Sequence, residues 1–369
     1  GNTGQGENAV AIGNQAGNSA QSEKTIAIGN FSGSISQGAN SISIGNAAAN
    51  NLQGPDSVAI GPAAGLNQQG ASAVSIGESA GSSLQGEMGV AIGAGAGQNN
   101  QSARAVAIGV STGSTNQGLE SIAIGFNSAT VSQGSSAVAI GKEAGNISQG
   151  SSSVAVGRNC GATSQGSQAV ALGFYAGFSS QGSSSVAIGN EAGSTNQGGG
   201  SVSIGQFSAS NSQGTRAVAV GYYSGRSSQR FNAVAIGHAA GSSNQREQAV
   251  AIGHNAGNSN QGVDSVSIGF NAGVSGQGTN CVAVGSGSGG TSQGANSVCI
   301  GVSAGRGVTG GLPGAAAGSI SICGDSVNGL PAQTANAFFV RPIRQVNNGS
   351  GVGNLHYLPA TNEVVYSGN

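Results

Sequence analysis

The chain has 369 residues, of which 70 are glycine and only 6% are charged, with a formal net charge of −1. The scarcity of proline, at 6 residues, excludes a collagen triple helix, and the near-neutral charge lacks the basic surface that nucleic-acid binding requires. No run of eighteen apolar residues is present, so the sequence predicts no membrane insertion.

One short phrase recurs every sixteen residues without insertion or deletion. It first occupies Ala9–Gly13 and last occupies Ser297–Gly301, and there are nineteen copies. Val or Ile always lies three residues before the closing Gly, and Ile, Val or Leu lies directly before it. One such unit has too little apolar surface to fold alone, so the units must stack. The sequence therefore predicts an all-β fold, a parallel β-roll or β-solenoid of sixteen-residue coils, over residues 1–305.

Each unit contains the signals of two strands and two turns. The alternation in Ser57–Gly61 predicts a short strand, and a small pair, here Ala64 and Gly65, follows after two variable residues. Further along, a glutamine is usually followed by a glycine, which permits the positive φ of a tight corner. Coils stacked about 4.8 Å apart would give nineteen of them a length of roughly 90 Å.

The Val/Ile strand can face two ways. We favour small residues inside the narrow coil, which leaves Val and Ile as an outer stripe along the whole shaft. Soluble monomers rarely expose apolar patches beyond a few hundred Å², so this arrangement predicts a homotrimer with three stripes on a common axis. The alternative places Val and Ile inside the coil and the small face at the interface.

A glutamine row runs in register with this stripe. One slot holds Gln from Gln5 to Gln293, and Gln133, Gln149, Gln165 and Gln181 are four successive members. Amides stacked about 4.8 Å apart can hydrogen-bond along the axis. We favour a structural ladder over a repetitive ligand-binding face, because buried polar groups need partners.

The repeat resembles the head repeat of a known adhesin family. The phrase Ser-Val-Ala-Ile-Gly, followed by a small-residue strand and a Gly turn, is similar to the head repeat of trimeric autotransporter adhesins of Gram-negative bacteria. The resemblance covers residues 9–305. It implies a left-handed parallel β-roll with three chains side by side and an adhesive role on host surfaces.

The period breaks after Arg306. Residues 306–336 form a Gly-rich transition in which one degenerate rung returns at Ser319–Gly324, and residues 337–369 are predicted to form a C-terminal β-hairpin cap. The hairpin strands are expected within Leu355–Leu358 and Glu363–Ser367.

This C-terminal segment resembles the one that closes fibre and tail-spike proteins of large DNA viruses and phages. In many of those proteins it directly precedes a self-cleaving chaperone that trimerises the fibre. The resemblance implies a virion-surface fibre, and we expect Asn369 to be a processed end.

The residues that usually carry chemistry are scattered. Glu7 and Glu23 share a slot in adjacent coils, and a glycosidase would need two carboxyls about 5 Å apart, but that slot is variable in other coils. His238 and His254 share another variable slot, without a third metal ligand. The four cysteines fall in unrelated slots and predict buried free thiols. We therefore expect no enzyme activity, no catalytic residue, no cofactor and no metal.

Aromatic and cationic residues gather in one stretch, between Gln206 and Glu247. Tyr and Arg dominate interface hot spots, so the stretch is a candidate receptor-binding patch, with neutral variation at solvent slots as the alternative. The candidate residues are Phe207, Arg216, Tyr222, Tyr223, Arg226, Arg230, Phe231 and Arg246.

The sequence thus predicts the shaft of an extracellular fibre on a virion or cell surface. Its partners would be two further copies of the chain and a glycan or protein of a host surface. The alternatives are a bacterial trimeric adhesin head and a fibre-borne polysaccharide depolymerase.

Overall fold

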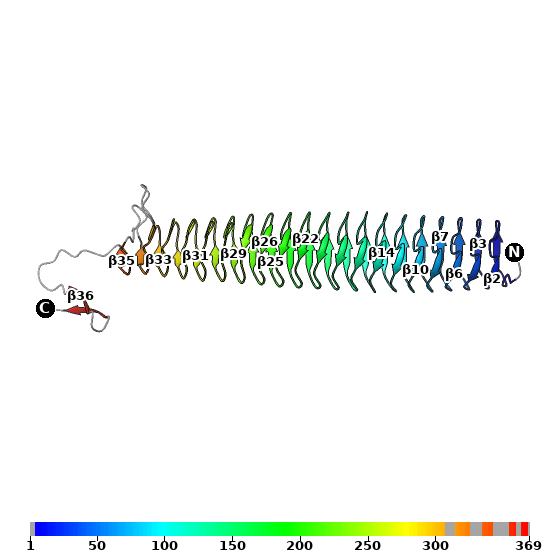
Figure 1. The fold of residues 1–369 in the computed structure, drawn as a ribbon, viewed down its shortest axis with the longest axis horizontal. Coiled ribbons are helices and arrows are strands. Elements are labelled where there is room, and N and C mark those ends of the chain that lie inside the picture. Colours follow the sequence, from blue (N-terminus) through cyan, green and yellow to red (C-terminus); the bar gives the residue numbers. More distant parts are fainter. Residues whose placement is uncertain (1–3, 307–313, 325–333, 342–353, 359–362, 368–369) are drawn as a thin grey trace.

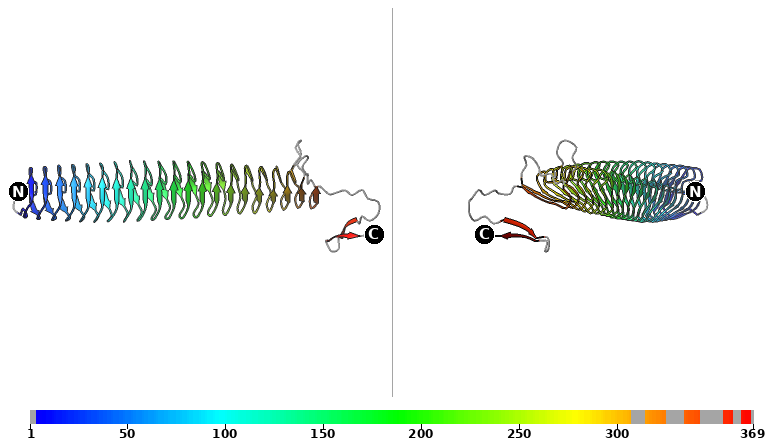
Figure 2. Two further views of the ribbon diagram at one scale, coloured as in Figure 1. Left: turned by 180° about the vertical axis from the view of Figure 1, so that it is seen from behind. Right: turned by 60° about the vertical axis from the view of Figure 1, so that its left-hand side comes forward.

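The computed structural model describes residues 4–306, 314–324, 334–341, 354–358 and 363–367. In the repeat region, sixteen-residue coils stack along one axis into a parallel β-solenoid, which forms an unbranched rod (Figures 1 and 2). The predicted all-β solenoid of sixteen-residue coils is confirmed, because each strand pairs in parallel with the equivalent residues sixteen positions away.

The larger sheet, here called the Val/Ile sheet, has 21 strands and contains the recurring phrase. All three residues of each strand pair with the next coil, as in Val138↔Val154, Ala139↔Ala155 and Ile140↔Val156. Its strands are β1 (Val10–Ile12), β3 (Ile26–Ile28), β5 (Ile42–Ile44), β7 (Val58–Ile60), β9 (Val74–Ile76), β11 (Val90–Ile92), β13 (Val106–Ile108), β15 (Ile122–Ile124), β17 (Val138–Ile140), β19 (Val154–Val156), β21 (Val170–Leu172), β23 (Val186–Ile188), β25 (Val202–Ile204), β27 (Val218–Val220), β29 (Val234–Ile236), β30 (Val250–Ile252), β31 (Val266–Ile268), β32 (Val282–Val284), β33 (Val298–Gly301), β34 (Ile320–Cys323) and β35 (Phe338–Arg341).

The second sheet, here called the Gln sheet, has 14 strands, each ending on the repeated glutamine. After β28 the pairing continues as isolated bridges, from Ser227↔Ser243 to Ser275↔Thr291. Its strands are β2 (Ser19–Gln21), β4 (Ile35–Gln37), β6 (Asn51–Gln53), β8 (Asn67–Gln69), β10 (Ser83–Gln85), β12 (Asn99–Gln101), β14 (Thr115–Gln117), β16 (Val131–Gln133), β18 (Ile147–Gln149), β20 (Thr163–Gln165), β22 (Ser179–Gln181), β24 (Thr195–Gln197), β26 (Asn211–Gln213) and β28 (Ser227–Gln229).

Two corners join the sheets in every coil. The first corner runs from a Val/Ile strand to the next Gln strand, and the second corner returns to the following Val/Ile strand. Gly141 opens a first corner with φ +129°, and a Cβ there would lie 2.5 Å from the carbonyl oxygen of Gly157 in the next coil. Only glycine fits such a position, which explains why this slot never varies.

The coil interior is filled by small side chains. Ala139 is fully buried, whereas Ile140 of the same strand is 37% exposed. Ala139 belongs to a buried cluster with Ala144 and Cys160 from the first corner. The favoured orientation is therefore confirmed: small residues face inward, and Val and Ile lie on the outer face of the Val/Ile sheet.

The C-terminal part of the described chain adds two strands to this sheet. β34, the expected degenerate rung, pairs in parallel with β33, and β35 pairs in parallel with β34. The sequence had grouped Phe338 with the hairpin segment, but Phe338–Arg341 is instead the last strand of the Val/Ile sheet. The hairpin itself consists of β36 (Asn354–Leu358) and β37 (Glu363–Ser367), which pair antiparallel.

Candidate functional site

The eight residues of the predicted receptor patch lie on two different corners. The two corners form opposite edges of the flattened coil (Figure 1). The sixteen-residue spacing placed them in neighbouring coils but did not show which corner each one occupies. The first corner holds Phe207, Tyr222, Tyr223 and Arg226. The second corner holds Arg216, Arg230, Phe231 and Arg246.

The first-corner residues contact one another across adjacent coils. The rings of Phe207 and Tyr223 stack with centroids 5.0 Å apart and planes 8° from parallel. The Arg226 guanidinium lies 4.7 Å from the centroid of Tyr223, a cation–π contact. Tyr222 packs edge-on against Tyr223 at 4.2 Å. The structure therefore unites half of the predicted patch.

An aromatic row continues from this group along the rod. Tyr222 lies 5.2 Å from His238, His238 stacks on His254 at 4.6 Å, and His254 stacks on Phe270 at 5.3 Å, measured between ring centroids. Phe270 was missed by the sequence analysis, although its place sixteen residues after His254 was the available signal. Most of the ring faces in this row are covered by the neighbouring rings, so the row offers ring edges to the solvent.

The second-corner residues form a separate, more polar group. The Arg216 guanidinium lies 5.8 Å from the ring centroid of Phe231. Arg230 and Arg246 line a cavity of about 370 Å³ together with Asn244, Glu247 and Asn260. Arg230 and Arg246 thus present two cations on this corner, and no aromatic side chain lines their cavity.

The glutamine row lies inside the coil. Gln133, Gln149, Gln165 and Gln181 expose 2–3% of their surface. Each donates from Nε2 to a backbone carbonyl of the Val/Ile strand of its own coil, as Gln149 does to Val138 at 2.9 Å. Gln133 also donates to Oε1 of Gln149, and Gln165 to Oε1 of Gln181, both at 3.1 Å. This geometry fits a structural role, because it ties each coil across its interior and joins these coils in pairs along the axis. The axial ladder is interrupted, since Oε1 of Gln133 and of Gln165 has no hydrogen-bond partner.

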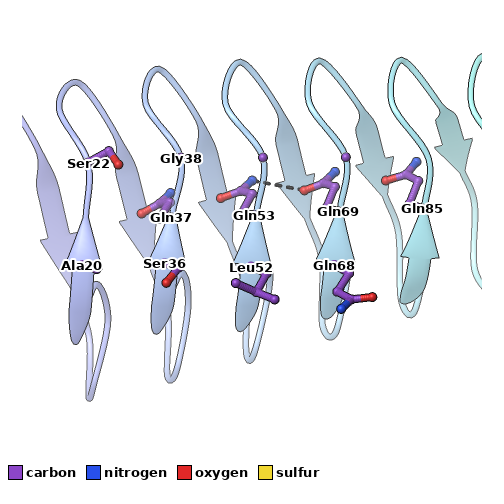
Figure 3. A pocket seen from close by; sticks show the side chains of 12 residues that line it. Ala20, Ser22, Ser36, Gln37, Gly38, Leu52, Gln53, Gln68, Gln69 and Gln85 are labelled. Carbon is purple, nitrogen blue, oxygen red and sulfur yellow. Dashed lines mark hydrogen bonds between the residues drawn. The ribbon is translucent and has the colours of Figure 1, made fainter.

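A groove follows the Gln sheet on its way into the second corner. Near the N-terminal end it forms a hollow of about 630 Å³ lined by Gln37, Gln53, Gln69 and Gln85 and by the residues around them (Figure 3). Figure 3 shows the glutamine repeated from coil to coil, with Nε2 of Gln53 bonded to Oε1 of Gln69 at 3.2 Å. The slot before it varies and holds Ala20, Ser36, Leu52 and Gln68.

The remaining candidates do not assemble into a reactive centre. Among the described residues, no group of three or more His, Cys, Asp or Glu side chains could hold a metal ion. The four cysteines are buried and free, and burial raises the pKa of the Cys160 and Cys299 thiols to about 12. Glu23 lies 3.5 Å from Lys24, an exposed pair of little energetic weight.

No family model matches the chain, and no curated protein or solved structure is significantly similar to it. Within the part of the chain that the structure describes, no helix has the length and apolar character needed to span a membrane.

Proposed function

We propose that the chain is the shaft of a homotrimeric extracellular fibre, which projects from a virion or cell surface and attaches to a host surface. The observation that supports this most strongly is the outer face of the Val/Ile sheet. Ile92, Ile140, Ile204, Ile236 and Ile268 expose 36–38% of their surface in a straight row. A Val lies beside each of them in the same strand.

The area of this stripe calls for a partner. Burying an aliphatic side chain contributes about 1.5–3 kcal/mol at about 25 cal/mol per Å², which corresponds to roughly 100 Å² of apolar surface. A partly exposed Ile and Val in each coil therefore add up to an area on the order of 1,000 Å² over the shaft. That exceeds what soluble monomers expose and matches one partner's share of a stable interface.

The Gln sheet does not present the same need. Its outward residues are mainly Ser, Thr and Asn, and the large apolar exceptions are limited to Ile35, Leu52, Leu84, Val131 and Ile147. Because each rod has one apolar face, a closed assembly in which copies meet around a common axis is favoured, and an open stack of sheets is not. A long, rigid rod of this kind suits projection, and its polar corners are left free for attachment.

The test is the oligomeric state of paired variants in one coil. Ile92→Lys places a charge on the outer face of β11, and Asn99→Lys places the same charge on the exposed face of β12. Sedimentation should show a trimer for the wild type and Asn99→Lys, and a monomer for Ile92→Lys, because a buried unpaired charge is costly. A well-folded wild-type monomer at micromolar concentration would overturn the proposal.

A further inference from the structure

Two arginines share one cavity on the second corner, in the coils between β28 and β30. Arg230 and Arg246 occupy the slot that directly follows the repeated glutamine, where glycine stands in most coils. Both side chains are exposed, and together with Asn244, Glu247 and Asn260 they line a volume of about 370 Å³.

The charges in this cavity are not balanced. Within the described chain, neither arginine forms a salt bridge, since the ion pairs involve Lys24, Arg104 and Lys142. The two guanidinium groups belong to adjacent coils, whose backbones lie about 4.8 Å apart. Like charges placed side by side in a sheet repel each other. Glu247 offsets only one of them, so an anionic ligand would relieve the repulsion.

The cavity is part of a trough that runs along the rod. A second hollow of about 310 Å³ shares Arg230 and is lined by the equivalent slots one coil earlier, including Ser212, Gly214 and Ser228. The hollow near the N-terminus occupies the same slots but has Gly38, Gly54 and Gly70 in place of arginine. Equivalent slots thus form a hollow at two places along the rod, and the cationic one contains Arg230 and Arg246.

We propose that this cationic trough binds the sulfate or carboxylate groups of an acidic polysaccharide lying along the fibre axis. The inference deepens the proposed attachment function by naming its ligand class. Guanidinium groups form charge-assisted hydrogen bonds with such anions. The amides of Asn244 and Asn260, themselves joined by a 3.1 Å hydrogen bond, are placed to contact sugar hydroxyls. The two cavities have no aromatic lining residue on which nucleic-acid bases could stack, which favours a glycan.

The test uses a variant that restores the residue typical of the slot. Arg230→Gly combined with Arg246→Gly removes both charges and recreates the composition of neighbouring coils. Lys142→Asn combined with Arg158→Asn is the matched control, since it removes two positive charges from adjacent coils of the first corner, where Asn30, Asn46 and Asn190 hold the equivalent slot. Binding to heparin, polygalacturonate and neutral dextran is measured by surface plasmon resonance at physiological salt.

We expect the wild type and the Lys142/Arg158 control variant to bind heparin or polygalacturonate but not dextran, and the double glycine variant to bind at least tenfold more weakly. Preference between the two polyanions then identifies sulfate or carboxylate as the group recognised. Single-stranded DNA is measured in the same way. No binding by the wild type, an equal loss in the Lys142/Arg158 control variant, or tighter binding of the wild type to single-stranded DNA than to either polyanion would overturn the inference.

Sedimentation of the same samples separates this inference from the proposed function. A wild-type trimer that binds neither polyanion refutes the trough and leaves the shaft intact. A wild-type monomer that binds heparin through the two arginines refutes the trimeric shaft and leaves the trough intact.

Discussion

The two sheets of each coil are built from the same chain period but hold together in different ways. In the Val/Ile sheet every residue of a strand pairs with the next coil. In the Gln sheet only the first and third residues pair, as in Ile147↔Thr163 and Gln149↔Gln165, because Ser148 between them has φ +57°. The Gln strands therefore bend at their middle residue, which does not pair with the next coil. The amide of the buried glutamine supplies hydrogen bonds that a straight strand would have made through its backbone.

This difference explains where the sequence tolerates change. The Val/Ile sheet continues through β35, whereas the Gln sheet gives way to isolated bridges after β28. The arginines at positions 230 and 246 lie beside this weaker sheet, on the second corner. The proposed binding residues therefore lie where the regular ladder of the Gln sheet ends.

The largest effect is expected at the glycine that opens the first corner. Gly141→Ala combines a strained positive φ with a Cβ 2.5 Å from the Gly157 carbonyl oxygen, so it should lower the free energy of unfolding by about 3 kcal/mol or more. Thermal and denaturant unfolding followed by circular dichroism measure the change.

Gly95→Ala is the control for this clash. Gly95 also has a positive φ, +65°, but its added Cβ would meet no atom closer than 3.8 Å. It should therefore cost only about 1 kcal/mol. Equal losses of unfolding free energy in both variants would show that backbone strain, and not the packing of one coil on the next, requires glycine at the repeated position.

A strict period made most of this fold predictable. Ala139 and Ile140 alternate, and the narrow coil leaves room inside only for the smaller of the two, so the orientation of the Val/Ile strand followed from size. The glycine row then allows only direct stacking, which sets the register. The left-handed residue within each Gln strand was not foreseen, because Ser, Asn, Leu and Gln all occupy it and none signals a bend.

The candidate patch was less predictable, for a geometric reason. Arg226 and Arg230 are four residues apart in the sequence, but the Gln strand between them carries the chain from the first corner to the second. Repeat spacing reveals which residues stack along the axis, whereas their separation around the coil depends on backbone dihedrals. For the same reason, repeat spacing did not reveal that Phe338–Arg341 pairs with β34, and the sequence placed this segment in the terminal hairpin.

The contrast between the inner and outer faces of the Gln sheet can be tested at two adjacent glutamines. Gln69 is buried and donates to the Val58 carbonyl at 2.9 Å, whereas Gln68 is exposed. Gln69→Ala should cost about 2 kcal/mol, because it leaves a buried carbonyl without its partner and opens a cavity. Gln68→Ala should cost less than about 0.5 kcal/mol. Similar losses at both positions would mean that the ladder contributes nothing specific to stability.

The last effect concerns the space between the two sheets and is absent at neutral pH, because it appears only under alkaline conditions. The Cys160 thiol lies in the coil interior, where its Sγ is 3.1 Å from the Gly157 carbonyl oxygen. Burial raises its pKa from the ordinary value of 9.0 to about 12. A thiol with a raised folded-state pKa binds its proton more tightly when folded, so its contribution is fully present below pH 9 and is lost as the pH rises towards 12. The unfolding free energy should therefore fall by up to about 1.4 kcal/mol per pH unit from this group alone.

Cys160→Ala places in this slot the residue that most other coils carry, and its unfolding free energy should fall less steeply between pH 9 and 11 than that of the wild type. Parallel pH profiles for the two proteins would show that water reaches the interior and that the sheets are less closely packed than the buried alanines indicate.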